Sequence, residues 1–242
     1  MKTKICLAVM FFCISPAMAV INITGGVYHG LITDGNEEMM ISGGSIFYVE
    51  ARADSRVTMS GGEISFSCAI TDNAFFAMSG GAIGSSLGIS DSADSIITGG
   101  FIENTVAIDN GHITISGGTT NQLFVDNIAS ITVGSFVFTP SNEQFVMYDG
   151  EIILRKQATL TIYGYNFTVN GIPAFGEIKS RFGDEYTYEP VRHIKGMLGN
   201  GGIIDGDFQI GEFASIKLVN IPEPSIIVLL SGGLLLVLHR RK

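Results

Sequence analysis

A repeat of roughly 18–19 residues fills much of the N-terminal half of this chain and constrains its fold more than any other feature. Six segments share a Ser or Thr followed by two glycines, as in "MMISGGSI" and "VTMSGGEI", and a weaker seventh copy reads "ITVGSF". The anchors of these copies, at nearly constant steps, are Thr24, Ser42, Ser60, Ser79, Thr98, Ser116 and Gly134. Spacing this regular indicates structural units that stack on one another.

Two apolar columns recur in these units. The residues just before the anchors are Ile23, Ile41, Met59, Met78, Ile97, Ile115 and Val133, and those four residues after them are Tyr28, Ile46, Ile64, Ile83, Ile102, Thr120 and Phe138. Short runs of β-branched residues between Gly and Asx turns predict strands, and the paired glycines disfavour helix. One unit is too small to bury its own apolar side chains, so identical columns must stack. The sequence therefore predicts an all-β fold, a parallel β-helix or solenoid with about three short strands per coil.

The handedness of the coil has two interpretations. Ile64, Ile70 and Phe76 stand six residues apart, a spacing typical of a left-handed hexapeptide solenoid. Arg52 and Asp126 interrupt that spacing in other coils, which favours a right-handed coil.

From about Thr139 the repeat is no longer visible. Strand-like runs continue, "RHIKGMLGNGGIIDGDFQIG" predicts a hairpin around Gly199 to Gly202, and "FASIKLV" predicts a last strand. An open solenoid end exposes unpaired N–H and C=O groups and invites self-association. We therefore expect a solenoid over residues 20–138 and a β-rich cap over residues 139–219, with ligand binding by the cap as an alternative role.

The N-terminus predicts a secretory signal peptide over residues 1–19. Lys2 and Lys4 precede an apolar run, and Ala17-Met18-Ala19 forms a small-residue cleavage site. The apolar run is too short for a stable membrane span. Cleavage after Ala19 would leave Val20 as the new N-terminus.

Charge and cysteine content limit the partners and the chemistry. From Val20 to Val137, two basic residues stand against twelve acidic ones, a net charge of minus ten. That field repels nucleic acid and anionic lipid, whereas cations or neutral sugars are compatible with it. Removing the signal leaves Cys68 as the only cysteine, so no intramolecular disulfide is expected and a small buried side chain is predicted there.

Three aspartates form the strongest candidate polar site. Asp72, Asp91 and Asp109 each stand seven residues before an anchor, so they are expected to stack at one corner of the coil. Carboxylates at coil spacing repel one another, and bound calcium would relieve that repulsion. The alternative is that Asp simply forms turns well.

The same three carboxylates define an enzyme hypothesis, a secreted polysaccharide lyase or hydrolase on a β-helix. Neither His29 nor His112 has an evident nucleophile or metal partner at diagnostic spacing. No catalytic residue is predicted, and we expect a protein that is not an enzyme.

The C-terminus combines three features in order. The motif Pro222-Glu223-Pro224-Ser225 is followed by an apolar segment, residues 226–238, and then by the basic residues Arg240, Arg241 and Lys242. The apolar segment would be about 20 Å long as a helix, short against the roughly 30 Å of membrane hydrocarbon. A single transmembrane helix with its basic end in the cytoplasm is expected.

This arrangement resembles the PEP-CTERM protein-sorting signal. The resemblance implies an exported protein of a Gram-negative bacterium that makes exopolysaccharide, and a membrane protease of the exosortase type that removes the tail. The protein would pass through the inner membrane transiently and reach the cell surface or the extracellular matrix of a biofilm. The resulting expectation is a structural or interaction protein associated with exopolysaccharide. A permanently anchored membrane protein is the alternative, and it differs only in the fate of the tail.

Overall fold

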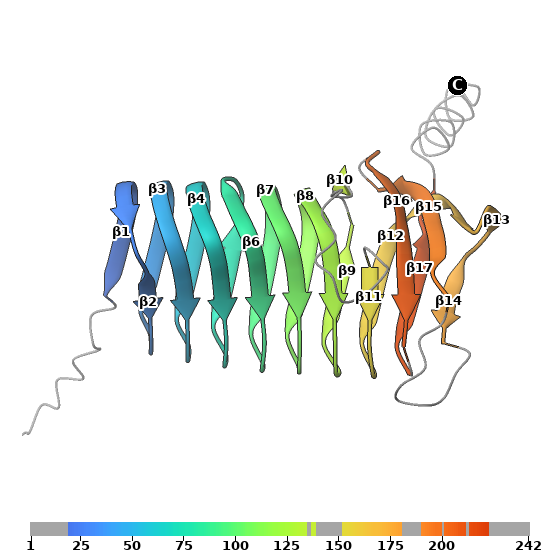
Figure 1. Cartoon of the computed structure of the whole chain (residues 1–242), viewed down its shortest axis with the longest axis horizontal. Helices are drawn as coiled ribbons and strands as arrows, with labels where there is room; N and C mark the ends of the chain where they lie inside the picture. The colour runs from blue at the N-terminus through green and yellow to red at the C-terminus, as the bar shows by residue number, and fades with distance from the viewer. Residues whose placement is uncertain are drawn as a thin grey trace, which may run out of the picture.

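The computed structural model describes residues 19–134, 137–138, 152–180, 190–199, 201–211 and 213–222. Within these residues all regular structure is β, and the strands stack along one long axis (Figure 1). The stacked strands make about six solenoid-like turns, which confirms the prediction of an all-β solenoid.

Seventeen strands of the described ranges belong to one hydrogen-bonded system. They are β1 (Val20–Tyr28), β2 (Leu31–Thr33), β3 (Glu38–Ala51), β4 (Arg56–Ile70), β5 (Phe75–Met78), β6 (Ala82–Ile89), β7 (Asp94–Ala107), β8 (His112–Val125), β9 (Ser130–Val133), β10 (Val137–Phe138), β11 (Ile152–Leu154), β12 (Thr159–Val169), β13 (Ile172–Pro173), β14 (Gly176–Lys179), β15 (Arg192–Leu198), β16 (Ile203–Ile210) and β17 (Ser215–Asn220).

Parallel pairing follows the sequence repeat. Val20 pairs with Glu38, Glu38 with Arg56 and Arg56 with Phe75, so each step along the stack advances the chain by one repeat. The strands are longer than expected, because β3, β4, β7 and β8 each run through their glycine pair for 14 or 15 residues. The corner is made by a shift in register, as between Ile41 and Ser42, and the strand does not end there.

The predicted apolar columns form the interior. Every residue of the column before the anchors is buried, at most 4% exposed. In the second column, Ile46, Ile64, Ile83 and Ile102 are buried, and the Thr120 hydroxyl lies 3.0 Å from that of Thr105 inside the core. The core is therefore a set of ladders that run along the stack, as the repeat predicts.

Stacking continues beyond the visible repeat. Strand β11 pairs in parallel with both β8 and β16, and β12 pairs in parallel with both β9 and β17. Val125, Leu154 and Ile210 consequently form one buried column. Part of the segment expected as a cap thus adds coils of the same kind to the solenoid.

The C-terminal end of the stack carries antiparallel strands. Strand β14 pairs with β17, and β15 pairs with both β12 and β16. The hairpin of β15 and β16 and the last strand β17 confirm the predictions made for these segments. Strand β13 is joined to β12 by a two-residue turn, Asn170-Gly171, in which both φ angles are positive.

The segments predicted as signal peptide and sorting tail fall largely outside the described residues. No helix among the described residues is long and apolar enough to cross a membrane. The segment 226–238, expected as a transmembrane helix, lies outside the described residues, and so do residues 1–18 of the signal peptide.

Candidate functional site

The three aspartates of the candidate ladder lie together at one corner. The backbone N–H of Ser92 donates to the carbonyl oxygen of Asp72 at 2.8 Å, and that of Asn110 donates to the carbonyl oxygen of Asp91 at 2.9 Å. Asp72, Asp91 and Asp109 also share a left-handed backbone, with φ of 58°, 56° and 56°. Asp and Asn adopt this conformation more readily than most residues, which explains their recurrence at this corner.

The carboxylates of this ladder accept hydrogen bonds from neighbouring coils. Asp72 Oδ2 accepts from the Ala53 N–H at 3.0 Å, and Asp91 Oδ2 accepts from the Asp72 N–H at 3.4 Å. Asp109 Oδ1 accepts from the Asn127 side-chain amide at 2.7 Å. The bonding favours the turn-forming interpretation.

Metal binding was the other hypothesis for this corner. Within the described part of the chain, no group of three or more His, Cys, Asp and Glu side chains is arranged to hold a metal ion. Calcium binding by Asp72, Asp91 and Asp109 remains an untested prediction.

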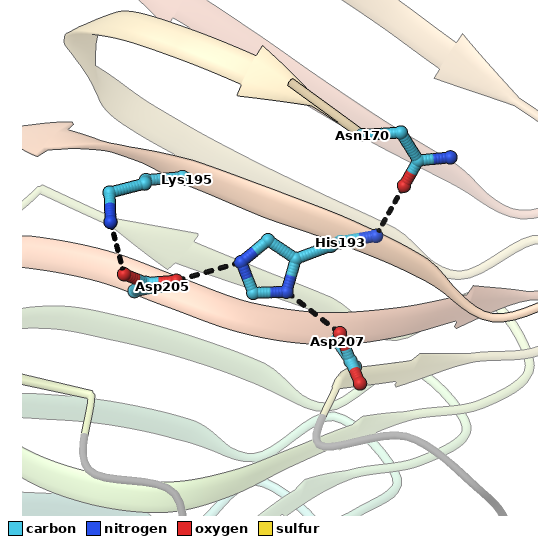
Figure 2. Close-up of polar contacts among 5 residues, drawn as sticks. All are labelled: Asn170, His193, Lys195, Asp205 and Asp207. Carbon is cyan, nitrogen blue, oxygen red and sulfur yellow. Dashed lines mark hydrogen bonds and ion pairs between the residues drawn. The ribbon is translucent and has the colours of Figure 1, made fainter. Parts of the chain in front are cut away.

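A second polar cluster lies on the hairpin of β15 and β16. His193 pairs across the hairpin with Asp207, and Lys195 pairs with Asp205. Figure 2 shows the His193 ring between the two carboxylates, with Nδ1 2.8 Å from Asp207 Oδ1 and Nε2 2.7 Å from Asp205 Oδ1. The Lys195 ammonium donates to Asp205 at 2.6 Å, and the Asn170 side chain accepts from the His193 backbone N–H at 2.8 Å.

The two carboxylates change how His193 titrates. Hydrogen bonding to Asp207 and then to Asp205 raises the pKa of His193, whereas the hydrogen bond from Lys195 lowers the pKa of Asp205. The His193 side chain is 47% exposed, so water and salt screen these interactions. The cluster is therefore suited to fixing the hairpin register and holding charge at the surface.

A row of aromatic side chains lies exposed on the first coils. We call His29, Phe47 and Phe66 the aromatic row. The rings of Phe47 and Phe66 are stacked, with centroids 5.1 Å apart and planes 4° from parallel, and His29 meets Phe47 edge-on at 6.3 Å. Phe47 is 50% and Phe66 52% exposed, a large apolar area to leave in water. Such rings are suited to contact a ligand that offers C–H groups.

Polar side chains lie next to this row in the sequence. The Tyr48 hydroxyl donates a hydrogen bond to the Glu50 carboxylate, and the Arg52 guanidinium donates to the same group. These bonds, that from Tyr48 first, lower the pKa of Glu50. Tyr48 packs over Gly30, where an added Cβ would lie 2.7 Å from the ring. A carboxylate held by two partners thus stands three residues after Phe47 in the sequence.

The predicted processing sites flank the fold. The carbonyl oxygen of Ala19 accepts a hydrogen bond from the Glu38 N–H at 2.9 Å, directly before β1 begins. Pro222, the first residue of the sorting motif, follows the end of β17 by two residues. Glu223, Pro224, Ser225, Arg240, Arg241 and Lys242 lie outside the described residues.

Comparison of the chain with family models, with curated proteins and with solved structures finds no match.

Proposed function

We propose that this chain is an exported structural or interaction protein of the cell surface or extracellular matrix of a Gram-negative bacterium, retained there with exopolysaccharide. The observation that carries the proposal is the aromatic row, exposed on the first coils and followed in the sequence by the hydrogen-bonded group of Tyr48, Glu50 and Arg52. The proposal includes a right-handed coil, because Arg52 and Asp126 interrupt the six-residue spacing of the left-handed form.

The chemistry of the row fits a neutral sugar. Exposed Phe rings gain free energy by packing against the C–H faces of a pyranose, and Glu50 and Arg52 supply an acceptor and donors for its hydroxyl groups. The acidic N-terminal region, with twelve acidic and two basic residues from Val20 to Val137, disfavours a polyanion. The ligand we propose is therefore a neutral exopolysaccharide.

The two predicted cleavage positions support the proposed export of the protein to the cell surface. Cleavage after Ala19 would leave β1 whole, and the Pro-Glu-Pro motif starts only after β17 has ended. Both cuts would spare every strand from β1 to β17, and the first would remove only the hydrogen bond between Ala19 and Glu38. This position supports an exosortase-type protease as a partner and passage through the inner membrane by the C-terminal segment.

Affinity electrophoresis through gels containing the host's own exopolysaccharide tests the binding. We expect the wild-type protein to be retarded and the variant Phe47→Ala/Phe66→Ala to lose about tenfold in affinity, the equivalent of about 1.4 kcal/mol. Phe175→Ala is the matched control, because Phe175 is 82% exposed but lies outside the row. No retardation of the wild type by any native matrix fraction would contradict the proposal, and equal losses in both variants would contradict the role of the row.

Intact mass spectrometry of protein recovered from the cell-surface and medium fractions tests the sorting. We expect a species that begins at Val20 and ends between Pro222 and Ser225. Protein that still carries Lys242 would mean that the tail is a permanent anchor.

A further inference from the structure

The two ends of the stack differ in how their strands are covered. At the C-terminal end, the antiparallel strands β14 and β15 pair with the last coil. At the N-terminal end, β1 and β2 pair only with β3 among the described residues. Among the described residues, the C-terminal end of the stack is thus closed by added antiparallel strands, whereas the N-terminal end presents the outer edge of β1 and β2.

The hydrogen bonds of the first coil identify which backbone groups are free. Because the Ala19 carbonyl accepts from the Glu38 N–H, the alternation of a parallel ladder directs the polar groups of Ile21 and Ile23 toward β3. Those of Val20 and Asn22 then point away from the stack. In β2, the Thr33 carbonyl accepts from the Arg52 N–H at 3.0 Å, so the polar groups of Ile32 also point outward.

The composition of this edge does not prevent pairing with another strand. Strands β1 and β2, "VINITGGVY" and "LIT", contain no charged side chain and no proline, so signal removal leaves the Val20 α-ammonium as their one charge. By contrast, β14 carries Glu177 and Lys179, whose side chains lie 3.2 Å apart, and β13 contains Pro173. Charges and proline are how natural proteins prevent pairing at a strand edge. Among the described edge strands, β13 and β14 have such residues, and β1 and β2 do not.

The core is also incomplete at this end. Ile21, Tyr28 and Leu31 continue the interior columns but are only partly buried. Their partners in the next coil, Met39, Ile46 and Val49, are fully buried. Val27 is 87% exposed on the same coil. Another strand layer over the first coil would bury this apolar surface.

We propose that the first coil is a dimer interface and that its occupant is the first coil of a second copy, with β1 antiparallel to β1 about a two-fold axis. Two copies of one edge related by a two-fold axis run antiparallel, so every free N–H can meet a free C=O. Because a two-fold contact uses the same edge of both copies, and the C-terminal edge strands carry charges and proline, the contact closes as a dimer and does not propagate into a fibre. The inference rests on the proposed export, since signal removal after Ala19 places the chain terminus directly at β1.

Sedimentation velocity of the processed protein, over a wide concentration range and in a detergent that disperses any retained tail, tests the dimer. The decisive variant is Asn22→Pro, which removes an outward N–H without removing a bond to β3. Its matched control is Asn22→Ala, which keeps that N–H. We expect dimers for the wild type and Asn22→Ala, and a dissociation constant at least tenfold higher for Asn22→Pro. Any contribution of a retained C-terminal tail to association is the same in the wild type and both variants.

Thermal unfolding followed by circular dichroism shows whether Asn22→Pro keeps its fold. If its melting temperature falls, Ile32→Lys gives the second test, since it places a charge on an exposed side chain of the same edge. A monomeric wild type, an equally stable Asn22→Pro dimer, or retention of residues 1–19 on the recovered protein would each overturn the proposal. Loss of polysaccharide binding in a dimeric protein would contradict only the proposed function.

Discussion

Gly117 lies so close to the preceding coil that an added Cβ would stand 2.2 Å from the carbonyl oxygen of Thr98. The same contact recurs between Gly99 and Ser79 at 2.5 Å. The second glycine of the pair has a different constraint, since Gly118 has a φ of 91°, a conformation that other residues rarely adopt. The repeated Gly-Gly therefore reflects two requirements, close approach of coils at the first position and backbone conformation at the second.

Replacing Gly117 with Ala should destabilise the protein by about 1–3 kcal/mol, because the coils must separate locally to admit the methyl group. The matched control is Gly88→Ala, since an added Cβ at Gly88 meets no described atom within 4 Å. That change should be neutral or stabilise by up to about 1 kcal/mol. Urea unfolding measures both free energies. Equal losses in the two variants would show that coil contact is not the reason for Gly117.

The solenoid was predictable from the sequence where one chain segment makes one coil. There, identical columns such as Ile41 and Met59 recur at a fixed spacing, and burial follows from the spacing alone. The later coils were not predictable. Thr159 pairs with Ser130, and Ser215 pairs with Thr159, across connections that are longer than one repeat and unequal in length, so the period is hidden.

The candidate sites, too, were predictable only where they follow from the repeat spacing. The ladder of Asp72, Asp91 and Asp109 follows from the repeat. The aromatic row does not, because Phe47 stands five residues after its anchor and Phe66 six, and only a shift in strand register brings them together. The pairing of His193 with Asp207 required the hairpin register, although the alternation of His193 with Lys195 was a usable signal.

Asp72 should contribute to stability through its backbone conformation and its acceptor. Asp72→Ala removes the bond from the Ala53 N–H and places Ala at a φ of 58°, so it should cost about 1–2 kcal/mol. Asp72→Asn keeps an acceptor and a residue that tolerates this conformation, so it should cost clearly less. Thermal and urea unfolding measure the stability of the two variants. If both variants lose polysaccharide-degrading activity with stability intact, the carboxylate is catalytic and the enzyme hypothesis is favoured.

Cys68 should be chemically inert in the folded protein. Its side chain is fully buried between the ladder neighbours Val49 and Leu87, and burial raises the pKa of the thiol far above its usual range. Only the thiolate reacts with iodoacetamide. We expect labelling of the processed protein to begin only as urea unfolds it, with the same midpoint as circular dichroism. Labelling in native buffer at the denatured rate would contradict the buried position.

Titration of His193 should show the influence of its two carboxylates. The pKa of His193 should lie above its ordinary value of 6.5, and Asp207→Asn and Asp205→Asn should each lower it, because each removes a carboxylate that stabilises the charged ring. Nuclear magnetic resonance of the His193 ring protons measures the pKa in each variant. A wild-type value at or below 6.5 would show that the ring does not lie between the carboxylates in solution.

The same shift has a consequence for stability. Because the folded pKa is raised, the stabilisation from charged His193 is complete below the unfolded pKa and disappears as pH rises through the folded pKa. The effect should be small, since the side chain is 47% exposed. Asp205 acts in the opposite sense, because its lowered pKa gives stability that is lost as the pH falls through the folded pKa. His193→Gln should therefore flatten the decline in melting temperature as the pH rises above 6.5 and leave an acid decline, whereas an unchanged profile above pH 6.5 would exclude His193 as its source.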